Sequence, residues 1–243
     1  MIIKMPDRQA YPQMAALWQR VFGDSMSCID AFFATGFAPE RCRIAWEEKV
    51  VGAGYWFDLG WQGGRYALLY ALAVDPALQG RGIGSQLVET LCQDLARQGY
   101  AGAVLAPASA SLYGYYARLG FAAFGCADTA RVTAFGDPVH LEKTNVQGYL
   151  QDRPGFAWGE GFSAFVASQC VFYRGEDAQL ICYKDTADVQ EYIGPKEKLP
   201  GILKGLGLEA ARVRMPGKNG PAGMCRKFQE AGELPGYFGP ILD

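Results

Sequence analysis

The segment VDPALQGRGIG, residues 74–84, connects two patterns of different periodicity. Before it, residues 66–74 (YALLYALAV) are almost continuously apolar, which is typical of a strand that is buried on both faces. After it, apolar residues recur every fourth position along one face of a predicted helix, which ends near Gln98 ahead of Gly99. The segment is therefore predicted to be a strand-to-helix turn.

The glycines of this turn predict an anion-binding site. Gly80, Gly82 and Gly84 let the backbone approach a ligand closely. The first N–H groups of the following helix have no partner within it and lie at the positive end of its dipole. Arg81 adds a fixed positive charge, and a pyrophosphate fits this arrangement. The alternative is a tight turn without a ligand, because glycine-rich turns are common between elements.

The turn matches neither of two common nucleotide-binding motifs. It is not a P-loop, because no Gly-Lys followed by Ser or Thr is present. The dinucleotide fingerprint G-x-G-x-x-G fails in both registers, since Ser85 and Leu87 occupy the positions of the third glycine.

Composition narrows the class of protein. The 243 residues are 50% hydrophobic and 20% charged, which is ordinary for a globular protein of one large or two smaller domains. The net charge of −2 gives no global field that attracts nucleic acid, so we expect no nucleic-acid partner. No apolar run reaches about 18 residues, so we expect no membrane span.

Cysteine and histidine usage points to a reducing compartment without a metal site. The seven cysteines are scattered and form no C-x-x-C pair, which favours free thiols over disulfides or zinc ligands. The single histidine, His140, excludes a His-rich metal site. The N-terminal residues lack the apolar stretch of a signal peptide, so the predicted location is the cytoplasm.

The rest of the first half predicts alternating elements. Asp7 is expected to cap a helix that runs to Phe22, after a short strand that begins at Ile2. The further elements are a helix at 29–35, a hairpin of strands 43–46 and 50–57, a strand at 101–105, a helix at 111–119 and a strand from 121.

The second half predicts a smaller α/β domain. Composition shifts over residues 137–154, which places a boundary between domains 1–144 and 145–243. The elements expected beyond it are helices at 162–173 and 199–206 and strands at 179–183, 211–215 and 223–228.

Two motifs in the first half carry a family resemblance. Val74-Asp75-Pro76, followed by Gln79, Gly82 and Gly84, matches V-x-P and then Q/R-x-x-G-x-G/A. Residues 116–121 (YARLGF) match Y-x-x-x-G-F. In this order and spacing, residues 1–140 resemble the GNAT superfamily of acetyl-CoA-dependent N-acetyltransferases. The extra domain behind them is weakly similar in placement to the two-part enzymes of the enhanced-intracellular-survival type.

The resemblance implies a fold and a cofactor site. The fold is mixed α/β, with a splayed central sheet flanked by helices. The co-substrate is acetyl-CoA, whose pyrophosphate is held by the loop and whose pantetheine arm pairs with the strand before it. The residues implied in binding are Leu72, Val74, Gln79, Gly80, Arg81, Gly82, Ile83, Gly84 and Ser85. Many relatives carry an asparagine where Ser109 stands, which puts that contact in doubt.

Tyr116 matches the general acid of the family, which protonates the departing thiolate. The alternative is a packed aromatic residue, and Tyr113 or Tyr115 could take its place. The implied reaction is acetyl transfer to a primary amine of an unidentified acceptor, either a small molecule or a peptide. A non-catalytic module that binds or senses acyl-CoA is the alternative. Exposed sheet edges in such folds often pair, so a homodimer is compatible with the sequence.

No general base is evident. Glu47 and Glu48 fall in a predicted turn and are expected to be solvated, Asp58 closes a strand, and His140 lies past both motifs. The aromatic C-terminal segment suggests a docked tail, whose terminal residue Asp243 could supply a carboxylate. Water could accept the proton instead.

Overall fold

The computed structural model describes residues 1–184, 186, 188–230 and 232–242. They form two compact units, each assembled from three stretches of chain. Unit 1 contains Met1–Ala122, Trp158–Phe165 and Met224–Glu233, and unit 2 contains Ala123–Ala157, Val166–Gly223 and the residues from Leu234 onward. This division differs from the single boundary after residue 144, because two late segments pack into unit 1. That 1–144 and 145–243 fold as separate domains stays a prediction.

The sheet of unit 1 follows chain order across its first five strands. The strands are antiparallel neighbours except β4 and β5, which run parallel. Residues Met224–Lys227 of a late strand, β13 (Gly220–Lys227), then pair antiparallel with β5. The first five strands are β1 (Ile2–Lys4), β2 (Cys42–Glu47), β3 (Lys49–Trp61), β4 (Gly64–Val74) and β5 (Gly102–Leu105).

Strands β4 and β5 separate partway along β4. Their pairing covers only three positions, the last of which joins Leu68 to Val104, although β4 continues to Val74. The register between β3 and β4 shifts near Gly54, and Ala71 has a positive φ of 48°. This is the geometry of a β-bulge, which bends a strand and ends its regular pairing. The C-terminal part of β4 therefore has one edge that β5 does not cover.

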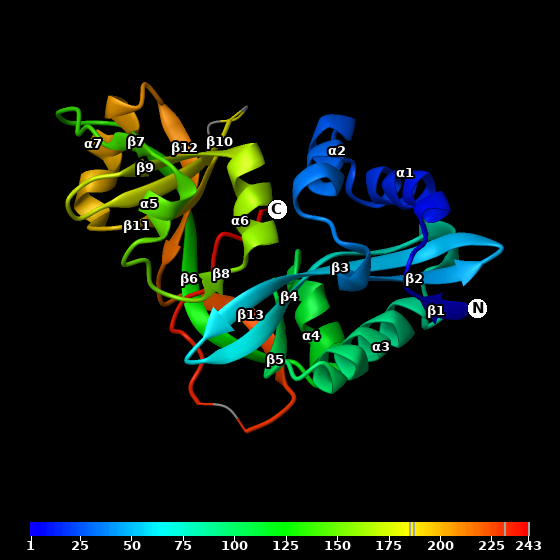
Figure 1. Ribbon diagram of the computed structural model, residues 1–243. Helices are drawn as coiled ribbons and strands as arrows, with labels where there is room; N and C mark the ends of the chain where they lie inside the picture. The colour runs from blue at the N-terminus through cyan, green and yellow to red at the C-terminus, as the bar shows by residue number, and fades with distance from the viewer. Residues whose placement is uncertain (185, 187, 231, 243) are drawn as a thin grey trace. The chain divides into compact units, whose positions relative to one another are not determined.

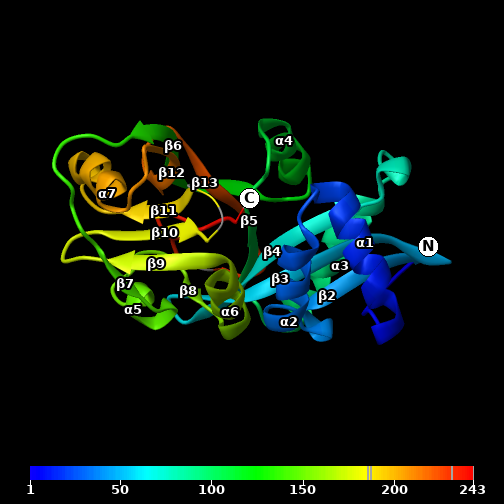
Figure 2. The same cartoon turned by 90° about the horizontal axis from the view of Figure 1, so that it is seen from above.

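Helices cover both faces of this sheet, as Figures 1 and 2 show. Helices α1 (Tyr11–Phe22) and α2 (Met26–Thr35) lie on one face, and α3 (Ile83–Arg97) lies on the other. Asp7 caps the short 3₁₀ turn that leads into α1, and Gly23 ends α1 in the left-handed conformation. Helix α4 (Ala110–Arg118) follows β5 and packs with α3.

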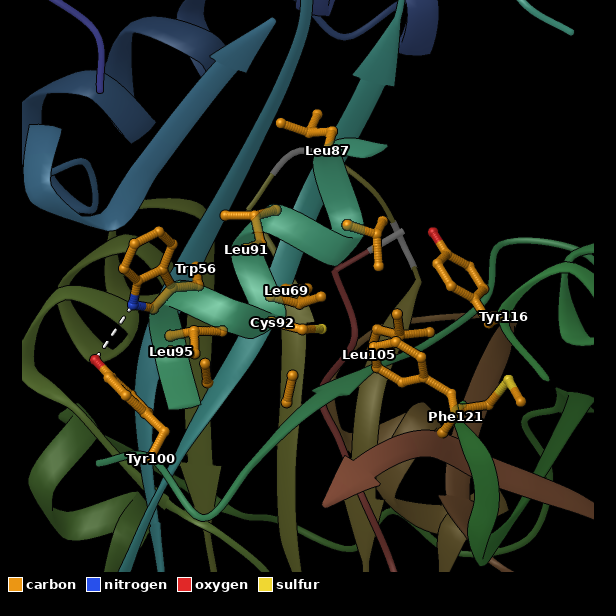
Figure 3. Packing of buried hydrophobic residues seen from close by; sticks show 14 residues of the cluster. Trp56, Leu69, Leu87, Leu91, Cys92, Leu95, Tyr100, Leu105, Tyr116 and Phe121 are labelled. Atoms are coloured by element: carbon orange, nitrogen blue, oxygen red, sulfur yellow. Dashed lines mark hydrogen bonds between the residues drawn. The ribbon is translucent and has the colours of Figure 1, made fainter. Parts of the chain in front are cut away.

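The core beneath α3 is apolar and shared with α4 (Figure 3). Leu87, Leu91 and Leu95 project from successive turns of α3 toward the sheet, as their fourfold spacing predicts. The indole of Trp56 donates a hydrogen bond of 3.2 Å to the hydroxyl of Tyr100 at the edge of this core. This core packs α3 against the sheet from Leu87 near its start to Leu95 near its end.

In unit 2 the sheet runs in the order β6, β12, β11, β10, β9, β7. Its neighbours are antiparallel except β11 and β12. The strands are β6 (Ala122–Thr133), β7 (Glu142–Thr144), β9 (Cys170–Arg174), β10 (Gln179–Tyr183), β11 (Val189–Ile193) and β12 (Ala210–Pro216). The remaining elements of the second half are α5 (Val146–Leu150), α6 (Glu160–Gln169), α7 (Leu199–Gly205) and the two-residue β8 (Ala157–Trp158).

The predicted mixed α/β class, with a splayed central sheet flanked by helices, is confirmed. One predicted element is wrong at its end: residues 170–173 continue as strand β9 and not as helix. They are a β-branched and aromatic run that pairs with both β10 and β7, and this pairing favours the strand. Among the residues that the structure describes, no helix is long and apolar enough to cross a membrane.

Candidate functional site

A cavity of about 600 Å³ opens at the uncovered edge of β4. It is bounded by the ends of α1 and β4, the glycine loop, the first turns of α3 and one face of α4. Nine of the ten predicted site residues line it, and Arg81 is exposed in the loop beside it. The nine are Leu72, Val74, Gln79, Gly80, Gly82, Ile83, Gly84, Ser85 and Tyr116. Their roles in binding and catalysis stay predictions.

Two loop glycines are required by backbone conformation. Gly80 and Gly82 both have φ of +79°, in the left-handed region. A Cβ at either position would meet no atom within 4 Å, so the constraint is conformational and not steric. A side chain there costs roughly 1–2 kcal/mol.

The first N–H groups of α3 face the cavity without a cap. Gly82 is the N-cap residue, and the first helical bond runs from Gln86 N to Gly82 O. The N–H groups of Ile83, Gly84 and Ser85 therefore have no acceptor within the helix, and no described side chain caps them. By contrast, the side chains of Asp7, Ser25 and Asn145 cap other helices of the chain. The start of α3 thus offers unpaired donors and the positive end of a dipole.

Asp75 anchors the beginning of the loop. Its buried carboxylate accepts a 2.9 Å hydrogen bond from Arg20 and a 3.1 Å bond from the N–H of Ala77. Its own N–H donates to the carbonyl of Val51 on β3 at 2.9 Å. The Gln79 amide donates to the carbonyl of Val74 at 3.3 Å, which ties the middle of the loop to the end of the strand.

The backbone of Val74 points away from β3. Because Asp75 N–H bonds to Val51, the antiparallel alternation directs the N–H and C=O of Val74 to the opposite edge of β4. That is the edge that β5 leaves uncovered after Leu68. A ligand arm laid along β4 would find the Val74 N–H available.

Two tyrosines of α4 reach the cavity in different ways. Tyr116 is buried in the shared core, and its hydroxyl points from there toward the part of α3 that carries Leu87 (Figure 3). Burial raises the pKa of Tyr116 well above its ordinary value, and the neighbouring Tyr115 raises it further. The Tyr115 hydroxyl lies at the start of α3, 3.4 Å from the Ser85 hydroxyl.

The cavity carries one charged side chain among its described lining residues, Arg118 at the C-terminal end of α4. Carboxylates and histidine are absent from that lining, so the cavity itself supplies no general base. Arg118 is exposed, and none of the described carboxylates pairs with it.

The candidate bases from the sequence lie elsewhere or outside the described residues. Asp58 accepts from Tyr100 and forms an ion pair of 3.1 Å with Arg41. It pairs with Ala67, five residues before Leu72, or roughly 15 Å along the strand. Glu47 and Glu48 are exposed at the β2–β3 turn, as expected, and His140 is exposed in unit 2. Asp243 lies outside the described residues.

Two further expectations concern Ser109 and metal binding. Ser109 is the N-cap residue of α4, but its hydroxyl bonds to that of Ser111 at 2.9 Å, and it does not line the cavity. Within the described part of the chain, no group of three or more His, Cys, Asp or Glu is arranged to hold a metal ion. All seven cysteines are free thiols.

Comparisons with known proteins agree with this geometry. Residues 11–121 match the model of the acetyltransferase (GNAT) family, a stretch that contains both sequence motifs and the whole lining of the cavity. Residues 11–121 are therefore similar to the GNAT family of acetyltransferases, over slightly less than half of the chain. No curated protein matches the chain at a significant level.

Solved structures extend the likeness beyond residues 11–121. A GCN5-related N-acetyltransferase from Anabaena variabilis has a TM-score of 0.70 at 13% identity, over 94% of this chain and 73% of its own. Eis1 from Mycobacterium abscessus has a TM-score of 0.61 at 14% identity, over 94% and 74%. A putative acetyltransferase from Pyrococcus horikoshii has a TM-score of 0.68 at 16% identity, over 99% and 95%. At these identities the likeness shows a shared fold.

The sequence missed several residues that line the cavity. Val21 and Phe22, at the end of α1, close it from a distant part of the chain. Tyr115 was considered only as a substitute acid, and Arg118 was part of a motif without a role. Arg118 lies three residues beyond Tyr115, on the same helix face, and this spacing was the available signal.

Proposed function

We propose that this protein transfers an acetyl group from acetyl-CoA to a primary amine. The observation that carries the proposal is the uncapped start of α3, together with Gly80 and Gly82 at positive φ, beside the uncovered edge of β4. The match of residues 11–121 to the GNAT family model supports it.

Coenzyme A fits the residues present on three counts. The loop N–H groups of 79–84 offer donors to a pyrophosphate at a helix start. The Val74 N–H is directed toward the space where an extended arm would lie. A volume of about 600 Å³ is within the range of sites that hold small-molecule ligands. Bound there, acetyl-CoA supplies the activated acyl group.

The chain's own residues then have separable tasks. Backbone N–H groups at the end of β4 are placed to polarise an acyl carbonyl and stabilise negative charge on its oxygen. Tyr116 is expected to donate its hydroxyl proton to the departing sulfur, since its raised pKa keeps it protonated at neutral pH. The loop and β4 hold the two reactants in register, which supplies much of the rate.

One observation favours the alternative of a non-catalytic acyl-CoA-binding module. The described residues of the cavity lining include no carboxylate and no histidine that could accept the proton of the amine. An amine that binds already deprotonated, or a water relay, removes the need for such a residue. The two functions therefore differ in whether an acceptor is consumed.

The test is acceptor-dependent loss of the thioester of acetyl-CoA, over a panel of small amines, amino acids and peptides. Thioester absorbance is the preferred readout, because the exposed Cys126 would itself react with a thiol reagent. Mass spectrometry of the acceptor should show one added acetyl group on nitrogen. Binding of acetyl-CoA without loss of thioester for any amine would favour the sensing module.

A further inference from the structure

Arg118 differs from most arginines of unit 1 because it forms no ion pair with the described carboxylates. Six arginines of unit 1 form ion pairs with carboxylates: Arg20, Arg41, Arg43, Arg65, Arg97 and Arg226. Arg118 forms none among the described residues, although it is the single charged side chain in the cavity lining. A guanidinium that faces a cavity without a carboxylate is suited to an anionic ligand.

Arg118 and the start of α3 line the same cavity from different helices. The Tyr115 hydroxyl lies at the start of α3, so near that a Cβ on Gly84 would be 3.1 Å from it. Arg118 is three residues further along α4, which is about 4.5 Å along the helix axis. The Arg118 side chain runs back along α4, since a Cβ on Gly114 would be 3.9 Å from its Nη1. The N–H groups of the loop and the guanidinium of Arg118 therefore belong to two different elements that line one cavity.

Coenzyme A has two separate anionic groups, the pyrophosphate and the 3′-phosphate on the ribose. The donors at the start of α3 match the first group, as proposed above. The second group needs a cation of its own, and Arg118 is the charged side chain among the described lining residues of the cavity. A planar guanidinium presents two parallel N–H donors to two phosphate oxygens, a fixed geometry that the ammonium of a lysine does not have.

Basic side chains also cluster in residues 196–227, but most of them are engaged by other contacts. Lys196 pairs with Asp128 at 2.9 Å, Lys198 pairs with Asp177 at 2.5 Å, and Lys204 donates to a backbone carbonyl at 2.6 Å. The ion pairs neutralise the charges of Lys196 and Lys198, and the Lys204 ammonium is occupied by its hydrogen bond.

We propose that Arg118 binds the 3′-phosphate of coenzyme A and makes the protein select coenzyme A over 3′-dephospho-coenzyme A. This inference rests on the proposed function, because it takes coenzyme A as the ligand of the cavity. It adds a specificity-determining residue to that site, with a role separate from the loop and from Tyr116.

Isothermal titration calorimetry of the full chain with both ligands tests the proposal. Wild type should bind coenzyme A about tenfold more tightly than the dephospho form, as one charge-assisted contact at a half-open site suggests. In Arg118→Ala this ratio should fall below about twofold, with affinity for the dephospho form unchanged. Arg118→Lys should keep part of the preference, and added salt should reduce it in wild type.

Arg8→Ala is the matched control, because Arg8 is exposed in unit 1, pairs with none of the described carboxylates and does not line the cavity. It should bind both ligands as wild type does. An equal loss of preference in Arg8→Ala would mean that any surface arginine contributes through its charge, without direct contact with the 3′-phosphate.

Equal weakening of both ligands by Arg118→Ala would mean that the guanidinium contacts the pyrophosphate. An unchanged ratio of the two affinities would mean that Arg118 does not contact the 3′-phosphate. Either result overturns the proposal while the proposed function stands. Absence of binding by wild type would overturn both.

Discussion

Tyr116 combines a ring buried in the core with a hydroxyl that reaches the cavity. Burial disfavours the phenolate, so the pKa of this side chain is raised from its ordinary value, and Tyr115 adds to the effect. The proton that a general acid must donate is therefore present throughout the physiological range.

The raised pKa predicts a one-sided pH profile. As pH rises, kcat/KM should increase while the acceptor amine loses its proton, and no descending limb should appear below about pH 10. Initial rates of thioester loss from about pH 6 to 10 check this prediction. A fall with a midpoint near pH 8 would assign the essential acid to another group.

The side chains of the site were predictable where a motif fixed their spacing. Gln79, Gly82 and Gly84 were located because they match the Q/R-x-x-G-x-G/A motif of the family that the sequence resembles. Phe22 and Arg118 were not assigned, because nothing local shows that the end of α1 and the last turn of α4 face the same cavity. Long-range packing, and not periodicity, brings them there.

Among the connecting elements, the glycine loop is the one whose conformation should control binding. Gly82→Ala forces a side chain into the left-handed region, which costs roughly 1–2 kcal/mol. The loop should relieve this strain by moving the N–H groups at the start of α3, so affinity for coenzyme A should fall about tenfold. Calorimetric titration measures the change.

Gly63→Ala is the matched control for the loop. Gly63 has φ of +78°, has open space around its Cβ position and lies in the β3–β4 turn, outside the cavity lining. Its substitution should lower thermal stability by a similar amount and leave affinity for coenzyme A unchanged. If both variants lost affinity equally, strain in the loop would not explain the effect.

The turn between β12 and β13 depends on Asp128 of β6. Its carboxylate accepts from Lys196, from the N–H groups of Asn219 and Lys218, and from the Asn219 amide, and these bonds lower its pKa to about 2. The folded-state pKa lies below the ordinary value of about 3.9, so Asp128 stabilises the fold above about pH 4. That contribution should be lost as pH falls toward 2.

Asp128→Asn should remove part of this acid sensitivity. The midpoint temperature of thermal unfolding should fall less steeply between about pH 4 and 2 in the variant than in wild type. Parallel curves for the two proteins would mean that other carboxylates govern acid unfolding.

Elements with long, regular patterns were predicted, and short ones were missed. The fourfold spacing of leucines in α3 and the apolar run of β4 need no tertiary information. By contrast, β7, β8 and α5 have two to five residues each, too few for a period to be visible. The error at residues 170–173 has the same origin, because pairing with β7 and β10 decides their state.

A buried ion pair between Arg153 and Glu191 lies in the interior of unit 2. Arg153 and Glu191 lie 2.7 Å apart with almost no exposure, and Tyr149 donates a hydrogen bond to the same carboxylate. Removal of one partner leaves an uncompensated charge in the interior. Glu191→Ala should therefore lower the free energy of unfolding by about 3–5 kcal/mol in chemical denaturation.

Asp152→Asn provides the contrast, because Asn tolerates the positive φ of 58° at this position. Its ion pair with Arg174 is 3.3 Å long, and the Asp152 side chain is 79% exposed, so its loss should cost less than about 1 kcal/mol. Similar losses in the two variants would mean that burial does not set the strength of these pairs.

The division into units could not be predicted from a local shift in composition. Trp158–Phe165 and Met224–Glu233 belong to unit 1, although they follow residue 144 in the chain. Residues 224–227 pair with β5, and the N–H of Gly159 bonds to the carbonyl of Asp58 at 2.8 Å. Such pairings join residues a hundred or more positions apart, and no single sequence window contains both partners.

The most direct measurement of the central claim compares turnover and coenzyme A affinity in wild type and Tyr116→Phe, with Tyr113→Phe as control. Tyr113 lies on the same helix but does not line the cavity. Loss of a general acid should lower kcat at least about a hundredfold in Tyr116→Phe, with affinity for coenzyme A unchanged and Tyr113→Phe close to wild type. Wild-type turnover in Tyr116→Phe would contradict the assignment of Tyr116 as the acid, and absence of amine-dependent turnover in wild type would contradict acetyl transfer itself.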